Sequence, residues 1–139
     1  MSLRTPADYL ELARAENDSS VLHQLARCPY PFVWHALAAN PHTAPVTLLD
    51  LSTAQDSVWN DNRLLRLLAE HPRADHTVVR AVRDAVAAKL AEGERPYAAV
   101  LALAGRMELP AEEVRQLGTL RGASARLRSR LDRRLGLRG

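Results

Sequence analysis

Two stretches of this chain repeat the same pattern. The first is Val33-Trp34-His35-Ala36-Leu37-Ala38-Ala39-Asn40-Pro41, and the second, from position 64 to position 72, is Leu64-Leu65-Arg66-Leu67-Leu68-Ala69-Glu70-His71-Pro72. In each stretch apolar residues at helical spacing end at a polar residue followed by proline, which disfavours helical geometry in the residue before it. The same shift aligns Leu48 with Val79 and Leu51 with Val82, in a second apolar helix after each break. The pattern predicts a helical repeat, in which each unit buries its apolar face against its neighbours.

Outside the repeat, helix signals continue and strand signals are almost absent. The chain has no sustained period-two alternation and no Asn-Gly or Asp-Gly hairpin turn. We therefore expect an all-α fold. In the first half of the chain we expect a helix from Pro6 to about Glu16 capped by Thr5, a helix capped by Asp18 or Ser19 that ends near Cys28, a helix over Phe32–Ala39, and a helix capped by Thr43. In the second half we expect a helix introduced by Asn60-Asp61-Asn62, a helix capped by Asp75 that ends at Gly93, two helices that begin at Pro96 and Pro110, and a last helix from about Ala123 to Leu135.

The stretch from Leu25 to Thr43, Leu-Ala-Arg-Cys-Pro-Tyr-Pro-Phe-Val-Trp-His-Ala-Leu-Ala-Ala-Asn-Pro-His-Thr, resembles the bacterial leucine-rich-repeat-variant family. The resemblance covers about residues 18–90 and implies a right-handed, HEAT-like α-solenoid. The spacing of 31 residues is longer than the family's repeat, which predicts an insert around Thr53–Trp59. Some family members bind an iron–sulfur cluster through cysteines, but Cys28 is the only cysteine here and cannot build that site alone. We therefore expect no cofactor.

The length of 139 residues fits one domain. We expect a single helical-repeat domain over residues 1–139, with an N-terminal cap helix in 1–17, repeats in 18–92 and C-terminal cap helices in 95–139. Such an array, a short α-solenoid, needs caps because its terminal units lack a neighbour on one side.

Composition excludes several classes of protein. Hydrophobic residues make up 47% and charged residues 25% of the chain, as in globular proteins. No apolar run approaches the roughly 18 residues of a membrane span, and the segment Met1–Pro6 lacks the apolar core of a signal peptide. We expect a cytoplasmic protein that has no contact with membranes.

Motifs for catalysis are also missing, so we expect no enzyme and no catalytic residues. There is no P-loop, no Gly-x-Gly-x-x-Gly and no Gly-x-Ser-x-Gly, and residues 1–92 contain no glycine. His71, Asp75 and His76 are the nearest approach to a metal site, but their place in a turn after a helix favours ordinary polar turn residues. We expect His35 to be half-buried with a backbone partner, and Cys28 to be a small buried residue.

Positive charge gathers at the end of the chain. Residues 115–139 carry eight arginines and one aspartate, a net of +7, whereas residues 1–114 carry 11 basic and 15 acidic side chains, a net of −4. In the last helix the stripe Leu120, Leu127, Leu131 and Leu135 should face the core, which leaves the arginines outside. The candidate partner-binding residues of this helix are Arg126, Arg130, Arg133 and Arg134.

Two tryptophans, Trp34 and Trp59, complete the candidate partner-binding residues, since Trp is enriched at the energetic centres of protein interfaces. Because Phe32 and Trp34 lie two positions apart on one helix, one should be in the core and the other exposed. The predicted function is a non-catalytic protein–protein interaction module with an unknown, acidic protein partner. The alternative is a nucleic-acid-binding accessory protein that uses the arginine-rich helix; a second copy of the chain and a merely solvated cap helix stay open.

The position of the arginines distinguishes these hypotheses. If the tail arginines share one concave face with four others, the nucleic-acid hypothesis gains; if the tail is isolated on a convex end, it loses. The four others are Arg63, Arg66, Arg80 and Arg83.

Overall fold

The computed structural model describes residues 5–138, and over these residues the chain forms helices and no strands. The all-α prediction is therefore confirmed for this part of the chain; Met1–Arg4 and Gly139, which belong to the predicted caps, lie outside the described residues. The helices are α1 (Pro6–Ala15), α2 (Ser19–Leu25), α3 (Pro31–Ala39), α4 (Pro45–Leu51), α5 (Val58–Glu70), α6 (His76–Ala91), α7 (Tyr97–Ala104), α8 (Ala111–Leu117) and α9 (Ala125–Gly136).

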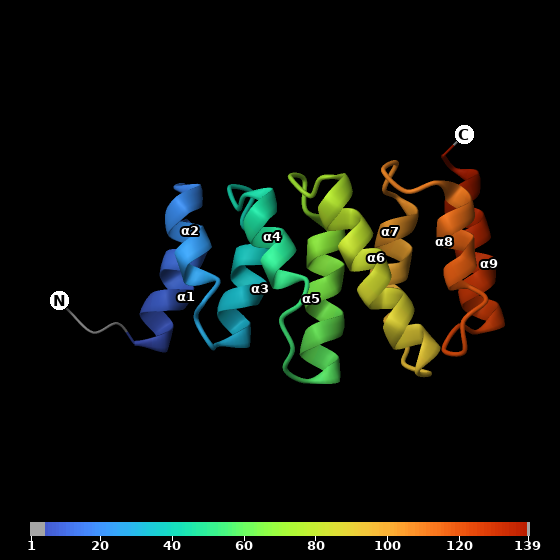
Figure 1. Cartoon of the computed structure of the whole chain (residues 1–139), viewed down its shortest axis with the longest axis horizontal. Helices are drawn as coiled ribbons and strands as arrows, with labels where there is room; N and C mark the ends of the chain where they lie inside the picture. Colours follow the sequence, from blue (N-terminus) through green and yellow to red (C-terminus); the bar gives the residue numbers. More distant parts are fainter. Residues whose placement is uncertain (1–4, 139) are drawn as a thin grey trace.

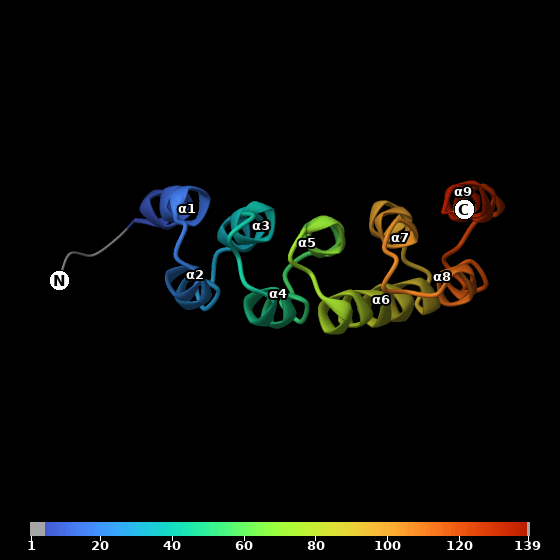
Figure 2. The same cartoon turned by 90° about the horizontal axis from the view of Figure 1, so that it is seen from above.

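The helices follow one another along the long axis of the molecule, with α1 and α9 at opposite ends (Figure 1). Seen from above they form two rows (Figure 2). The odd row contains α1, α3, α5, α7 and α9, and the even row contains α2, α4, α6 and α8. The array is slightly curved, because α1 and α9 stand further out on the odd side than α5 does. The outer surface of the odd row, called the odd face below, is therefore shallowly concave.

Side-chain caps and prolines set the helix boundaries. Thr5 forms a capping box with Asp8, and Asp18, Ser57, Asp75 and Ser124 each accept a hydrogen bond from a backbone N–H of the first turn. The helices α3 and α5 both end directly before an X-Pro pair, as their sequences predict.

Two predicted helix starts were wrong. Thr43 does not cap α4, because the N-cap residue of this helix is Ala44. The side chain of Thr43 is fully buried instead, and its hydroxyl donates to Leu37 O at 2.7 Å. The helix α5 begins at Val58, capped by Ser57, so Asn60-Asp61-Asn62 lie inside its first turns. At α5 the serine directly before the helix provides the cap, whereas at α4 no side chain caps the helix because packing buries Thr43.

The core runs along the whole array between the two rows. Leu37 in α3 and Leu68 in α5, which the repeat places at equivalent positions, are both 0% exposed. In α9 the residues Leu127, Leu131 and Leu135 are buried as predicted. Leu120 was wrongly placed in that stripe: it precedes the helix and is only half-buried.

A ladder of polar side chains connects the ends of the odd helices. Each member follows the C-terminus of one odd helix and donates to backbone carbonyls at the C-terminus of the preceding one. Asn40 donates from Nδ2 to Ala13 O and Glu16 O, both at 2.9 Å, and His71 contacts Asn40 O through Nε2 at 2.7 Å. Because unpaired buried carbonyls cost free energy, these contacts fix the register between successive units. The remaining contacts are Arg106 with His71 O and Ala74 O, and Arg138 with Leu103 O, Ala104 O, Arg106 O and Leu109 O.

The ladder requires a neutral His71. Its Nδ1 accepts a hydrogen bond from the backbone N–H of Arg73 at 3.0 Å, so Nε2 carries the proton and donates to Asn40 O. Asn40 does the same one unit earlier, because its Oδ1 accepts from the N–H of His42 while its Nδ2 donates. Burial lowers the pKa of His71 below its ordinary value, against a smaller opposing effect of the bond to Asn40 O.

We expect the protein to lose stability as the pH falls below about 6.5, the pKa of an unfolded histidine. Between that value and the lowered pKa of folded His71, the unfolded chain binds the proton and the folded chain does not, so acid favours unfolding. Burial also lowers the pKa of His35, which adds to the effect. Urea unfolding at pH 7.5 and pH 5 measures the loss.

The variant His71→Asn isolates the contribution of His71. Asparagine makes both ladder bonds at position 40, so it should keep the ladder and reduce the pH dependence. An unchanged pH dependence in this variant would contradict the assignment.

Candidate binding face

The odd face carries a groove over α7, bounded by α5 on one side and α9 on the other. Its floor contains Ala98 and Ala102, whose small side chains leave space between the larger residues of the neighbouring helices. The groove comprises two adjoining hollows of about 460 Å³ and 290 Å³, which share Arg66, Tyr97 and Ala98. We call it the α7 groove.

Five arginines line the α7 groove, and most of their charge is uncompensated. Among the described residues the side chains of Arg63, Arg95 and Arg130 make no hydrogen bond or ion pair. Arg66 pairs with Glu70 at 3.0 Å, and Arg134 donates weakly to Leu101 O at 3.4 Å. Glu70 is the acidic side chain lining these hollows, so the groove presents a strongly positive potential to solvent.

The arginines of the last helix divide into two pairs. Arg130 and Arg134 flank the buried leucine stripe on the side that meets α7, and they line the α7 groove. Arg126 and Arg133 are exposed on α9 and line none of the described hollows on the odd face.

The condition that would favour nucleic acid, namely that the tail arginines share one concave face with Arg63, Arg66, Arg80 and Arg83, is met only in part. Arg63 and Arg66 share the odd face with Arg130 and Arg134. Arg80 and Arg83 lie on α6, in the other row, where Arg80 pairs with Glu113 at 3.1 Å and Arg83 pairs with Asp84 at 3.2 Å. The positive charge of the odd face therefore comes from Arg63, Arg66, Arg130 and Arg134, and Arg80 and Arg83 do not add to it.

The two predicted tryptophans have different environments. Trp59 is 72% exposed and lines one of the two hollows of the α7 groove, and Tyr97 lines both. Trp34 is half-buried, and its indole N–H donates to Cys28 O at 2.6 Å. Its neighbour Phe32 is 41% exposed, so Phe32 is the exposed aromatic of that pair.

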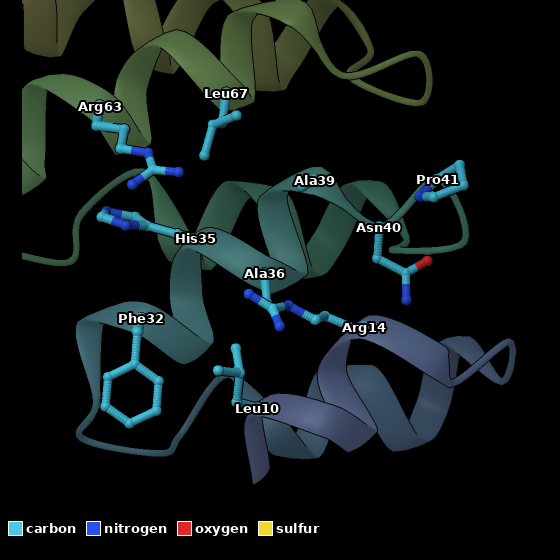
Figure 3. Close-up of a pocket in the computed structure, with 10 residues that line it drawn as sticks. All are labelled: Leu10, Arg14, Phe32, His35, Ala36, Ala39, Asn40, Pro41, Arg63 and Leu67. Atoms are coloured by element: carbon cyan, nitrogen blue, oxygen red, sulfur yellow. The ribbon is translucent and has the colours of Figure 1, made fainter. Parts of the chain in front are cut away.

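A second hollow of about 300 Å³ lies over α3, between α1 and α5 (Figure 3). We call it the α3 groove. Ala36 and Ala39 lie along its floor, and Leu10 of α1 and Leu67 of α5 line its sides. The two grooves adjoin across α5, because Arg63 lines both.

Histidine and cysteine residues take structural positions. His35 is 8% exposed and its Nε2 lies 3.0 Å from Asn60 O, which is the predicted backbone partner, although the ring is more buried than predicted. Cys28 is half-buried rather than buried. Within residues 5–138 no group of three His, Cys, Asp or Glu side chains is placed to hold a metal ion.

Sequence reasoning missed Arg95, Tyr97 and the alanine floor of the α7 groove. One signal was present: α7 carries alanine at positions 98, 99 and 102, and small residues on a surface helix between two arginine-bearing helices create a groove. The pairing of α7 with both α5 and α9 is what the sequence does not display.

No family model, curated protein or solved structure matches this chain. The resemblance to the leucine-rich-repeat-variant family therefore stays a prediction. No helix in the described part of the chain is long and apolar enough to cross a membrane.

Proposed function

We propose that this chain is a non-catalytic, cytoplasmic protein-interaction module, built as a short HEAT-like α-solenoid, whose α7 groove binds an acidic segment of another protein. The carrying observation is the set of five arginines around an alanine floor, with three of them unpaired. Guanidinium groups bind carboxylates through paired hydrogen bonds and are weakly hydrated, which suits them to this role.

The solenoid part of the proposal rests on the repeated architecture. Successive helix pairs occupy the two rows in chain order (Figure 2), and the members of the polar ladder follow one another at intervals of 31, 35 and 32 residues. A repeat array presents an extended concave surface, and such surfaces are commonly used for binding.

A short acidic segment fits the charge distribution better than a long polyanion does. The groove gathers five arginines, three of them from residues 1–114; without those three, this part of the chain carries 8 basic and 15 acidic side chains, a net charge of −7. A nucleic acid that extends from the odd face onto the rest of this part of the chain meets net negative charge, which repels its phosphates.

One observation favours single-stranded nucleic acid as the second candidate. Trp59 and Tyr97 stand beside Arg63, Arg66 and Arg95, and aromatic rings beside a basic groove provide stacking platforms for bases. The binding assay that tests the proposal therefore compares two labelled ligands, a 12-residue peptide rich in glutamate and a 12-nucleotide single strand.

Fluorescence anisotropy of the peptide tests the proposal with two matched variants. The double variant Arg130→Gln/Arg134→Gln should weaken binding roughly 2- to 30-fold, as expected for the loss of two exposed charge contacts. The double variant Arg126→Gln/Arg133→Gln removes the same charge from the same helix but leaves the groove intact, so its affinity should stay within about twofold of the parent.

If both double variants lose the same affinity for the peptide, the effect comes from overall charge, and binding in the α7 groove is contradicted. The nucleic-acid candidate becomes the better one if the oligonucleotide binds below 1 μM at roughly physiological salt and both Trp59→Ala and Arg130→Gln/Arg134→Gln abolish that binding.

A further inference from the structure

We infer that the α3 groove is an anchor site for one apolar side chain of the same acidic partner, so that the partner combines an acidic run with a separate leucine-like or phenylalanine-like residue. This inference rests on the proposed function, and it names a feature of the partner that the arginines alone do not specify.

The surface of the α3 groove is apolar in effect although polar residues line it. His35 is only 8% exposed and contacts Asn60 O through Nε2, and Asn40 is only 4% exposed, with its amide bonded to Ala13 O, Glu16 O and the N–H of His42. What remains for a ligand is the alanine floor and its leucine sides, which recognise an apolar side chain by shape and burial.

An aromatic ring closes one end of the groove. Phe32 is held by stacking on Tyr30, with 5.4 Å between the ring centroids and 14° between the ring planes, and yet it is 41% exposed. A ring that is fixed in place and open to solvent offers apolar contact at a small cost in conformational entropy.

The rim of the groove carries the charge that selects an acidic partner. Arg14 extends over the groove from α1 and Arg63 from α5 (Figure 3). Within the described residues neither guanidinium group makes a hydrogen bond or an ion pair. Carboxylates that flank the anchor residue complement both guanidinium groups, whereas a basic partner is repelled.

The position of the two grooves sets the spacing in the partner. The helices α3 and α7 are separated by α5 in the odd row, and packed helices lie about 8–10 Å apart, so the grooves are roughly 16–20 Å apart. An extended chain advances about 3.3 Å per residue. The anchor should therefore lie about five or six residues from the middle of the acidic run.

The test uses fluorescein-labelled peptides and the intact protein. Each peptide has a run of four glutamates in a Gly/Ser background, with either leucine or serine six residues from the middle of the run. A mirrored pair places this residue on the other side, since the groove admits either chain direction. In one direction at least, the leucine peptide should bind about tenfold tighter than its serine counterpart.

Two alanine variants assign that gain to a groove. Ala39→Gln fills the α3 groove and Ala98→Gln fills the α7 groove; both alanines are exposed and both variants conserve charge. Ala39→Gln should abolish the leucine gain and leave the serine peptide's affinity unchanged, whereas Ala98→Gln should weaken both peptides equally. If thermal melting shows that Ala39→Gln is not folded, Phe32→Ser provides the same test from the end of the groove.

The outcomes separate the two proposals. If serine peptides bind and leucine adds nothing in either direction, or if the gain survives Ala39→Gln and Phe32→Ser, the anchor site is overturned and the proposed function stands. If no peptide of the set binds, the proposed function fails and the anchor inference fails with it.

Discussion

Replacing Leu68 with alanine is expected to lower the free energy of unfolding by about 2–5 kcal/mol, the range for buried leucines whose removal leaves a cavity. Leu68 is 0% exposed, and it lies in α5, which packs between α3 and α7 and against α6. The free energy of unfolding of a small domain is roughly 5–15 kcal/mol in total, so this one substitution removes a large share of the stability. Urea unfolding followed by circular dichroism measures it.

Leu37→Ala should cost a similar amount, because Leu37 is also 0% exposed at the equivalent position of α3. Val46→Ala is the control: Val46 lies on α4 and is 57% exposed, so truncation there should change stability by less than about 0.5 kcal/mol. A Leu68→Ala protein as stable as the parent would contradict the assigned core face.

The helical architecture could be predicted from the sequence because local signals specify it. Proline after Asn40 and after His71 ends α3 and α5, and Thr5 and Asp75 cap α1 and α6 as predicted. Such signals act within three or four residues, and a single sequence displays them directly. Where two polar residues compete for one helix start, as Ser57 and Asn60 do, the outcome depends on packing and the prediction failed.

The ladder could be predicted only in part. The polar residue before proline was visible at positions 40 and 71, but its role is to donate to the preceding unit, 24 and 31 residues earlier. Arg106 and Arg138 extend the ladder without any proline behind them. Contacts at these separations depend on the register between units, which the repeat pattern suggests and does not fix.

The binding face required the packing of helices that are distant in sequence. Helical spacing places Arg130 and Arg134 beside the leucine stripe of α9, but it does not show which flank meets α7. Only the position of α9 beside α7 brings these two arginines opposite Arg66 of α5, across the alanine floor. The predicted set of four tail arginines is thereby divided into a pair in the groove and a pair outside it.

The position of α9 depends on a close backbone contact at Gly122, in the turn between α8 and α9. The N–H of Gly122 donates to Leu90 O at 2.7 Å, and its carbonyl accepts from the hydroxyl of Tyr97. A Cβ atom at this position would lie 2.0 Å from Glu94 O, a backbone atom. The turn between α6 and α7 and the turn between α8 and α9 therefore meet at a distance that only glycine permits.

Gly122→Ala is accordingly expected to destabilise the protein by at least about 1–3 kcal/mol, the usual cost of overpacking, because the atom it displaces is backbone and cannot rotate aside. It should also weaken binding of the glutamate peptide, since Arg130 and Arg134 reach the α7 groove only when α9 packs against α7.

Gly136→Ala is the matched control. Gly136 is the last residue of α9, and beyond its chain neighbours and the backbone of its own helix the added Cβ meets no atom within 4 Å, so alanine should stabilise the protein by up to about 1 kcal/mol and leave peptide binding unchanged. Parent-like stability and binding in Gly122→Ala would mean that the two turns do not meet as described, and that the groove does not depend on their contact.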